Sequence, residues 1–378
     1  MSFSADASLP PPRCRAEIDL AALRANVAFC QDLAGPDCEL MAVVKADAYG
    51  HGLEKVVAAL GDTLSWFGVA NFREALRARA AAGERAPRLL ILSPATPEEI
   101  EPIVAEGFSG SVSLPAEVTA YGAAAARLGK KAHLHAVADT GMGRMGCQPG
   151  QFAALVSVIR DHPHCVLEGI DTHFPSADED EVFTLAQIEV FRDLLGEVDP
   201  GEALVHLCNS AGLIGFHGKT RFASLARPGL ALYGISPLPG EAGQLRPVMS
   251  LKTRVTLVRR ITAGAGVSYG RTFVADRDMT VATLGVGYGD GYPRHLTGSG
   301  AEVLIAGQRC PLLGRVTMDQ IVVDVSSVDA EVVSGDEVVL IGRQGDEEIT
   351  AVELAKKAGT IPWEILTCIT NRVERVYF

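Results

Sequence analysis

The sequence lacks the features that mark membrane, secreted and nucleic-acid-binding proteins. No run approaches the roughly 18 consecutive apolar residues of a membrane span, and residues 1–7 hold no basic segment followed by an apolar one, so we expect no membrane contact and no signal peptide. Basic residues are scarce: 34 Lys and Arg against 46 Asp and Glu leave a formal net charge of −12. That balance disfavours nucleic acid as a partner, because phosphate binding requires basic patches.

The eight cysteines also lack a pattern. None forms a Cys-x-x-Cys pair, which disfavours both a disulfide framework and a zinc site. Scattered, unpaired thiols are typical of a reducing compartment, so we expect a cytoplasmic protein.

The 378 residues suffice for two domains. Residues 1–13 are polar and then proline-rich, which predicts a flexible leader. From residue 14 to 243, about eight short apolar runs alternate with Ala-rich helical segments, which favours an α/β fold, a (β/α)8 TIM-type barrel. The Gly-x-Gly-x-x-Gly spacing from Gly141 to Gly146 does not open a predicted helix, so it does not support a doubly wound dinucleotide fold. Residues 244–378 predict a mainly β C-terminal domain, and the strand at 16–20 is a candidate to join it.

The periodicity gives specific elements. Predicted barrel strands are 41–44, 66–70, 89–92, 110–113, 132–138, 167–172, 204–207 and 225–229, and predicted helices are 20–33, 53–60, 72–82, 116–128, 152–161 and 181–195. In the β domain we predict strands 255–258, 280–284, 301–305, 320–324 and 337–341 and one helix, 351–357.

Lys45 ends the first barrel strand and is the most informative residue. A lysine at the mouth of an apolar strand is desolvated, which lowers its pKa and frees the amine to form a Schiff base with a carbonyl. The alternative is a lysine that extends from a strand end to solvent. Tyr49, with Gly50 and Gly52, favours the first reading, because a phenol and open backbone beside an amine suit a phosphorylated carbonyl cofactor such as pyridoxal phosphate.

The segment Val44-Lys45-Ala46-Asp47-Ala48-Tyr49-Gly50-His51-Gly52 resembles the cofactor-lysine segment of alanine racemases, and further matches run almost to the C-terminus. The resemblance implies a barrel with a β domain, bound pyridoxal 5′-phosphate, an amino-acid substrate and a homodimer with active sites shared between subunits. It also implies interconversion of L-alanine and D-alanine, which supplies D-alanine for peptidoglycan in the cell wall.

Two side chains follow neighbouring predicted strands. Arg144 lies in the Gly-rich turn Asp139-Thr140-Gly141-Met142-Gly143-Arg144, and His173 follows strand 167–172. Both therefore belong to the catalytic face of a barrel. Alone, each would be read as a surface or structural residue. By resemblance, Arg144 supports the catalytic tyrosine and the substrate carboxylate, and His173 packs near the cofactor ring and bonds to an arginine.

The resemblance also implies a set of cofactor ligands. Ser210, with Tyr49 and the backbone of Gly229 and Leu230, would bind the phosphate, next to Asn209 in a strand-to-helix turn.

Arg227 would donate to the pyridine nitrogen by the same resemblance. A guanidinium cannot accept a proton, so that nitrogen would stay unprotonated and the ring would withdraw electrons less strongly. This favours racemisation over transamination.

Inverting a carbon requires a base on each of its faces. Lys45 serves one face, and by resemblance Tyr269 is the second base, presented to the active site of the other subunit, where the backbone of Met318 meets the substrate carboxylate. A phenol with a pKa near 10 is a poor base at neutral pH, so Arg144 is expected to stabilise the phenolate.

Two positions depart from the family pattern. Many members have a carbamylated lysine where this chain has Val137, so something else must position the arginine. Trp363 stands where the family usually has a tyrosine that touches the phosphate and narrows the entrance, and an indole donates but cannot accept a hydrogen bond.

Other functions stay open on the sequence. The departures allow a racemase for serine or a broader range of amino acids. A pyridoxal-phosphate carrier without turnover would need only the barrel. A decarboxylase on the same plan would need a glycine-rich phosphate loop and a cysteine in a comparable late motif, and we find neither. The pairs His133/His135 and His162/His164 have no acidic or thiol partner at metal spacing, so we predict structural or surface roles and no metal.

Overall fold

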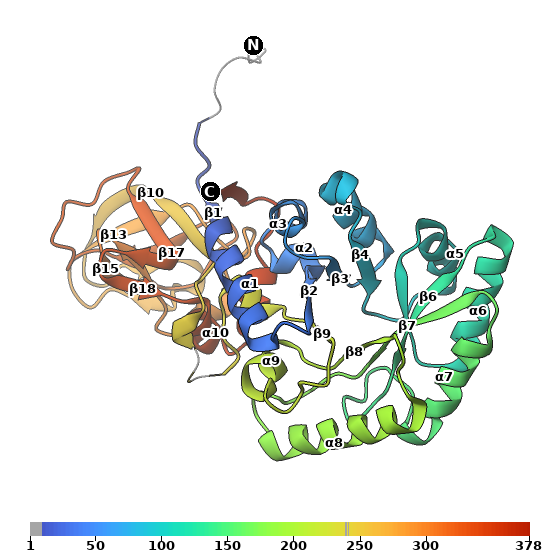
Figure 1. Ribbon diagram of the computed structural model, residues 1–378. Coiled ribbons are helices and arrows are strands. Elements are labelled where there is room, and N and C mark those ends of the chain that lie inside the picture. Colours follow the sequence, from blue (N-terminus) through green and yellow to red (C-terminus); the bar gives the residue numbers. More distant parts are fainter. Residues whose placement is uncertain (1–9, 239, 241) are drawn as a thin grey trace, which may run out of the picture. The chain divides into compact units, whose positions relative to one another are not determined.

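A computed structural model describes residues 10–238, 240 and 242–378 (Figure 1). Most of the predicted leader, residues 1–9, lies outside the described residues. The chain forms two compact units: Leu20–Arg246 is one, and the segment up to Asp19 joins Pro247–Phe378 in the other.

The first unit is a closed barrel of eight parallel strands, so the predicted fold class is confirmed. In order around the barrel the strands are β2 (Glu39–Val43), β3 (Trp66–Val69), β4 (Arg88–Ile91), β5 (Ser109–Val112), β6 (Ala132–Val137), β7 (Cys165–Asp171), β8 (Leu204–His206) and β9 (Leu225–Ala226). Strand β9 ends before Pro228, which has no N–H for a sheet ladder, so the predicted strand 225–229 was too long.

Helices surround these strands (Figure 1). They are α1 (Leu20–Ala34), α3 (Leu53–Leu60), α4 (Phe72–Ala82), α5 (Pro97–Glu106), α6 (Pro115–Leu128), α7 (Phe152–Asp161), α8 (Glu181–Val198) and α9 (Ser210–Phe216), with a short turn α2 (Lys45–Tyr49) and the 3-10 segments η1 (Gly83–Arg85), η2 (Pro149–Gln151), η3 (Leu230–Tyr233) and η4 (Ala242–Gln244). Helix α5 was not predicted, because Pro102 interrupts its pattern, but a capping box of Thr96 and Glu99 starts it.

The barrel interior has an apolar and a polar part. Met41, Trp66, Leu90 and Leu225, from β2, β3, β4 and β9, form a fully buried apolar cluster. Strands β5 to β8 instead contribute buried polar side chains, which are Ser109, Ser111, His135, Glu168, Asp171 and His206. The barrel interior is therefore filled by apolar side chains near β2, β3, β4 and β9 and by hydrogen-bonded polar side chains near β5 to β8.

A β-bulge makes the polar part possible. Strand β7 pairs Leu167 with Leu134 and Gly169 with His135, so Glu168 is the extra residue between them. In a regular strand, residues three apart face opposite sides, but the bulge lets Glu168 reach His135 and Asp171 reach His206, two rings that lie 2.7 Å apart.

The second unit is mainly β, with strands in the order β18-β17-β14-β15-β16-β13-β10-β1-β19. Its strands are β1 (Arg15–Ile18), β10 (Met249–Ile261), β11 (Gly266–Val267), β12 (Phe273–Val274), β13 (Met279–Leu284), β14 (Glu302–Ile305), β15 (Gln308–Leu313), β16 (Ile321–Asp324), β17 (Glu337–Gln344), β18 (Glu347–Ile349) and β19 (Glu374–Tyr377). Its helices are α10 (Ala351–Ala358) and α11 (Pro362–Thr367), with the 3-10 turns η5 (Tyr269–Arg271) and η6 (Arg294–Leu296).

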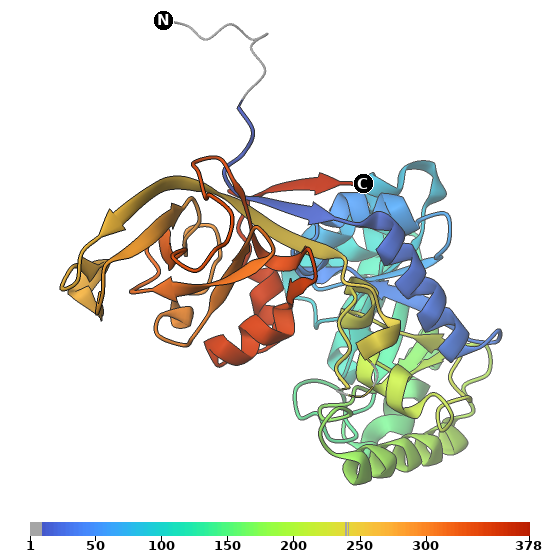
Figure 2. The ribbon, with the colours of Figure 1, turned by 90° about the vertical axis from the view of Figure 1, so that its left-hand side faces the viewer.

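This sheet closes on itself because β17 also pairs with β10. Strand β1 pairs antiparallel with β10 and parallel with the C-terminal strand β19, and β1 and β19 run side by side in Figure 2. Strands β11, β12, β15, β18 and β19 and helix α11 were not among the predicted elements, and β10 extends beyond the predicted 255–258. Strands β11, β12 and β18 have only two or three residues, and Pro311 interrupts the strand pattern of β15.

Across the part of the chain that the structure describes, no helix has both the length and the apolar character to cross a bilayer.

Gly169 is expected to be essential for packing, whereas Gly196 is not. A Cβ on Gly169 would lie 2.1 Å from Nδ1 of the buried His135, so Gly169→Ala should lower the free energy of unfolding by about 1–3 kcal/mol. The control Gly196→Ala adds a methyl group in open space on α8 and should raise that free energy by about 1 kcal/mol. Urea unfolding followed by circular dichroism measures both, and equal effects of the two changes would contradict the packing argument.

Candidate functional site

Lys45 follows β2 and opens a turn of unusual handedness. Ala46, Asp47, Ala48 and Tyr49 have φ values of 53, 55, 53 and 53°, which is one turn of left-handed helix. L-residues avoid this conformation, and each costs roughly 1–2 kcal/mol. The sequence predicted a glycine-containing turn here. Gly50 and Gly52 do have positive φ, but the turn itself consists of residues with side chains.

The environment of Lys45 agrees with the predicted desolvation. Burial lowers its pKa, and the positive charges of Arg144 and Arg227 lower it further, whereas the carboxylate of Glu74 acts in the opposite direction. An amine in such surroundings is a better nucleophile at neutral pH than an ordinary lysine.

Arg227 and His173 lie together, as predicted. Nη2 of Arg227 donates to the carbonyl of Thr172 at 2.7 Å and lies 3.4 Å from Nδ1 of His173. Burial, followed by the charges of Arg227, Arg144 and Lys45, lowers the pKa of His173 to about 3. His173 is therefore a neutral imidazole beside two guanidinium groups and an amine.

Arg227 starts a chain of hydrogen bonds into the barrel. Its Nη1 donates to Nδ1 of His206, and Nε2 of His206 lies 2.7 Å from Nδ1 of His135. Nε2 of His135 in turn lies 3.1 Å from a carboxylate oxygen of Glu168. Because a guanidinium only donates and a carboxylate only accepts, one tautomer of each histidine satisfies the whole chain, with both rings neutral.

Further polar contacts hold both ends of this hydrogen-bond chain, Glu168 and Arg227, in place. Glu168 also accepts hydrogen bonds from Arg88 and from Ser109, and Asp171 lies 3.8 Å from Arg227. Burial lowers the pKa of His206 well below its ordinary value, and the charge of Arg227 adds to this, which agrees with a neutral ring.

His135 and His133 have an acidic partner that the spacing along the sequence does not indicate. His135 is fully buried and bonded to Glu168, which agrees with the predicted structural role, and His133 lies 3.1 Å from the same carboxylate. Spacing along the sequence missed this because Glu168 comes from the neighbouring strand. The sequence did contain a signal for this contact: the predicted strands hold polar residues such as His135 and Glu168 among apolar ones. Barrel interiors usually hold branched apolar residues, so such polar residues indicate a buried hydrogen-bonded group.

Of the described residues, one group has the composition of a metal site: His135, Asp171 and His206, with ligand atoms within 4.8 Å of one another. The histidine nitrogens are already used in the hydrogen-bond chain, and the guanidinium of Arg227 lies beside Asp171. A cation would have to break these bonds and withstand that positive charge, so the geometry favours the hydrogen-bonded network.

The predicted phosphate ligands come together around Ser210. Its hydroxyl oxygen accepts the N–H groups of Gly229 at 3.0 Å and Ala231 at 3.1 Å. Tyr49 is buried, and its hydroxyl oxygen would lie 2.5 Å from a Cβ on Gly229, so only glycine fits there. Leu230 follows directly and begins η3.

Asn209 uses its side chain within the protein. Its amide oxygen accepts the N–H of Gly212 at 2.9 Å and so caps α9, and its amide nitrogen donates to the carbonyl of Phe174 at 3.1 Å. These contacts fix Ser210, the first residue of α9, relative to the loop that carries His173.

Arg144 lies on a loop shaped by Asp139. A carboxylate oxygen of Asp139 accepts the N–H groups of Gly141 and Gly143, both at 3.0 Å. The buried Val137 anchors the loop by accepting the N–H of Cys147 at 2.9 Å. The Arg144 side chain is exposed, and no described residue forms an ion pair with it.

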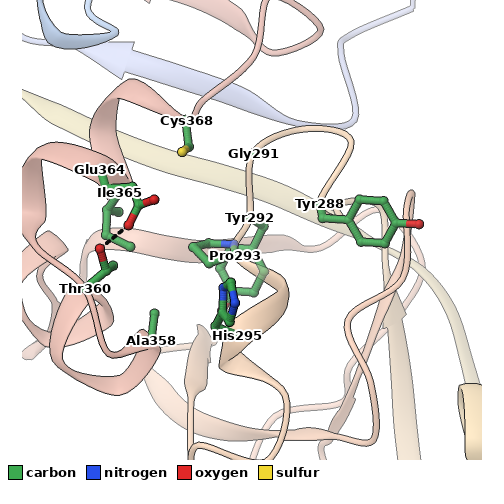
Figure 3. Close-up of a pocket in the computed structure, with 10 residues that line it drawn as sticks. All are labelled: Tyr288, Gly291, Tyr292, Pro293, His295, Ala358, Thr360, Glu364, Ile365 and Cys368. Atoms are coloured by element: carbon green, nitrogen blue, oxygen red, sulfur yellow. Dashed lines mark hydrogen bonds between the residues drawn. The ribbon is translucent and has the colours of Figure 1, made fainter.

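The remaining predicted residues belong to the second unit. Tyr269 is 72% exposed in η5, and Met318 is 52% exposed in the turn before β16. Trp363 lies on α11, which forms one wall of a cavity of about 260 Å³ (Figure 3). Residues from α10, α11 and the loop 288–295 line this cavity, and Glu364 accepts a hydrogen bond from Thr360 at its rim.

The hydrogen-bond chain predicts a pH-dependent contribution to stability. Burial alone would raise the pKa of Glu168, but contacts with His133 and His135 outweigh it and hold the pKa below 4.5. A lowered folded-state pKa stabilises the protein above the unfolded pKa, and this stabilisation is lost as the pH falls below it. Glu168→Gln should therefore cost about 2 kcal/mol of unfolding free energy at pH 7 and less at pH 4.

Urea unfolding at both pH values measures this difference, with the exposed Glu84→Gln as the control that should change little. A constant difference between Glu168→Gln and the parent protein across the pH range would contradict the assignment of a charged Glu168.

Comparison of the sequence with family models assigns both units of the chain to one family. Residues 18–237 match the family model "Alanine racemase, N-terminal domain", and residues 248–377 match "Alanine racemase, C-terminal domain". The alanine racemase of Symbiobacterium thermophilum is 42% identical over 369 residues, which cover 96% of each chain.

Solved structures give the same result. The crystal structure of alanine racemase from Streptomyces lavendulae superposes with a TM-score of 0.89 at 37% identity and covers 98% of each chain. An alanine racemase from Bartonella henselae, solved with covalently bound pyridoxal phosphate, has a TM-score of 0.89 at 29% identity and covers 97% of this chain and 100% of its own. With both family models matched and relatives similar over nearly their full length, the chain is an isomerase that belongs to the alanine racemase family.

Proposed function

We propose that the protein is a pyridoxal-phosphate-dependent racemase that interconverts L-alanine and D-alanine. The observation that carries this is Lys45, an amine with a lowered pKa on a left-handed turn at the end of β2, next to Arg227. The relatives named alanine racemase support the substrate, and the Bartonella henselae structure supports the cofactor.

The residues around Lys45 suit this cofactor. Ser210, Tyr49 and the backbone at Gly229 and Leu230 form a compact cradle for the phosphate, in which a side chain on Gly229 would collide with Tyr49. Asn209 positions the cradle, and His173 would lie near the ring, which Lys45 would hold covalently. When bound, pyridoxal phosphate supplies an electron-withdrawing ring that makes the α-proton of an attached amino acid more acidic.

Arg227 controls the strength of that effect. Its guanidinium is a donor, and His206 and the Thr172 carbonyl hold it in place as acceptors. A donor at the pyridine nitrogen leaves that nitrogen unprotonated, which moderates electron withdrawal and favours return of the proton to the α-carbon. This supports racemisation over transamination.

Two bases complete the proposal. Nζ of Lys45 moves the α-proton on one face of the substrate, and Oη of Tyr269 moves it on the other, with Arg144 stabilising the phenolate and the substrate carboxylate. We propose that Tyr269 and Met318 come from a second copy of the chain in a homodimer, and their exposure in the single chain supports this. The product D-alanine would supply peptidoglycan synthesis in the cytoplasm.

The direct test is incubation with L-alanine, L-serine and larger amino acids in heavy water. We would follow loss of the α-proton by NMR and formation of the D-isomer by chiral chromatography. Fast exchange and inversion confined to alanine support the proposal. Cofactor absorbance without exchange on any substrate would instead support the carrier function, and comparable rates on serine would support a broader racemase.

Tyr269→Phe tests the two-base mechanism. With one base removed, interconversion should fall by at least about a hundredfold, while Lys45 still exchanges the α-proton of one enantiomer with solvent. The control Tyr121→Phe removes a buried hydroxyl that has no partner among the described residues, and it should leave both rates unchanged. Equal loss of exchange for both enantiomers in Tyr269→Phe would argue against a separate base on each face.

Trp363→Tyr tests the second departure from the family. Since an indole is bulkier than a phenol and accepts no hydrogen bond, we expect the substitution to change pyridoxal phosphate affinity or the ratio of alanine to serine turnover. Equilibrium dialysis measures the first, and the heavy-water assay measures the second. An unchanged affinity together with an unchanged ratio would remove Trp363 from the site.

A further inference from the structure

We propose that Glu74 is a positioning residue for Lys45, since its carboxylate holds the backbone that follows the lysine in the left-handed turn and supplies a negative charge on that side of the amine. This inference rests on the proposed role of Lys45 as the residue that binds pyridoxal phosphate.

The contacts of Glu74 are specific. One carboxylate oxygen accepts the N–H of Ala46, the residue after Lys45, at 2.8 Å. The other accepts the N–H of Ala70, the residue after β3, also at 2.8 Å. One side chain therefore ties together the backbone at the ends of two neighbouring barrel strands, β2 and β3.

Glu74 itself is well fixed. It lies in the first turn of α4, where the side chain of Asn71 accepts its backbone N–H at 3.0 Å. The cap fixes the backbone of Glu74 beside the lysine turn, and the two hydrogen bonds of the carboxylate offset the rotamer freedom that its side chain loses.

The segment that it holds needs support. Four consecutive non-glycine residues in the left-handed region store strain of several kcal/mol, and such conformations persist only when surrounding contacts impose them. One turn along α4, Arg77 contacts Asp47 at 2.6 Å and Glu54 at 2.6 Å. Those pairs are about half exposed and join side chains only, whereas Glu74 is the residue of α4 that bonds directly to the backbone N–H after Lys45.

The chemistry requires a carboxylate. Both oxygens of Glu74 accept, whereas a glutamine would present one oxygen and one NH₂ group, and that NH₂ would face an N–H donor. The negative charge of Glu74 also raises the pKa of Lys45, whereas the positive charges of Arg144 and Arg227 lower it. Loss of the Glu74 charge should therefore lower the pKa of Lys45, so that more of the amine is neutral at a given pH.

The test uses the full-length protein, freed of cofactor and then mixed with pyridoxal phosphate. Covalent capture at Lys45 is followed by absorbance across pH and confirmed by borohydride trapping and mass spectrometry. In Glu74→Gln the pH midpoint of capture should move to lower pH, and the dissociation constant of pyridoxal phosphate should rise about tenfold. The control is Glu54→Gln, a nearby carboxylate that contacts Arg77 and should change neither value.

A second variant separates charge from geometry. Glu74→Asp keeps the charge but is one methylene too short to reach both N–H groups, so it should weaken binding while its pH midpoint stays nearer that of the parent. Circular dichroism checks folding. If both Glu74 variants match the parent in midpoint and affinity, Glu74 does not position Lys45. If the parent protein itself captures no cofactor, the proposed function is wrong. That outcome is distinguishable from failure of the Glu74 inference, in which the parent protein and both variants capture the cofactor equally well.

Discussion

The interior of the barrel depends on keeping one buried guanidinium satisfied. Arg227 is 5% exposed, and an arginine can only donate, so acceptors must surround it. The protein supplies His206 and the Thr172 carbonyl directly, and Glu168 at the far end of the histidine chain. That requirement accounts for two features of β7. The bulge directs Glu168 toward His135, and the absence of a side chain at Gly169 leaves room for the His135 ring.

The second constraint is the strained turn after Lys45. A strained turn of this kind persists only because surrounding contacts impose it, and here it follows directly on the amine at the end of β2. The two constraints act together: burial and the positive charges of Arg144 and Arg227 lower the pKa of Lys45, while Glu74 acts in the opposite direction. Several elements of the same unit thus set the pKa of one amine.

The two departures from the family pattern have different structural consequences. Val137 is buried and contributes through its backbone, which anchors the loop of Arg144, while Asp139 shapes that loop through two N–H groups. The arginine side chain itself is exposed and unpaired among the described residues. Trp363 lies on a short helix beside a cavity of the second unit, so its influence would act through that helix and its surroundings.

The sequence by itself determined the fold class, the ends of most helices of the barrel and the place of Lys45 at the end of a barrel strand. Alternating hydrophobicity and a contiguous motif are local properties, so they can be read from the sequence. His173 beside Arg227 also followed from the order of strands and the family resemblance. Only the tertiary structure decided that His135, His206 and Glu168 form one chain and that Glu74 reaches the lysine turn. Those contacts join different strands and helices through a bulge and a left-handed turn of non-glycine residues, and neither feature follows from local residue preference.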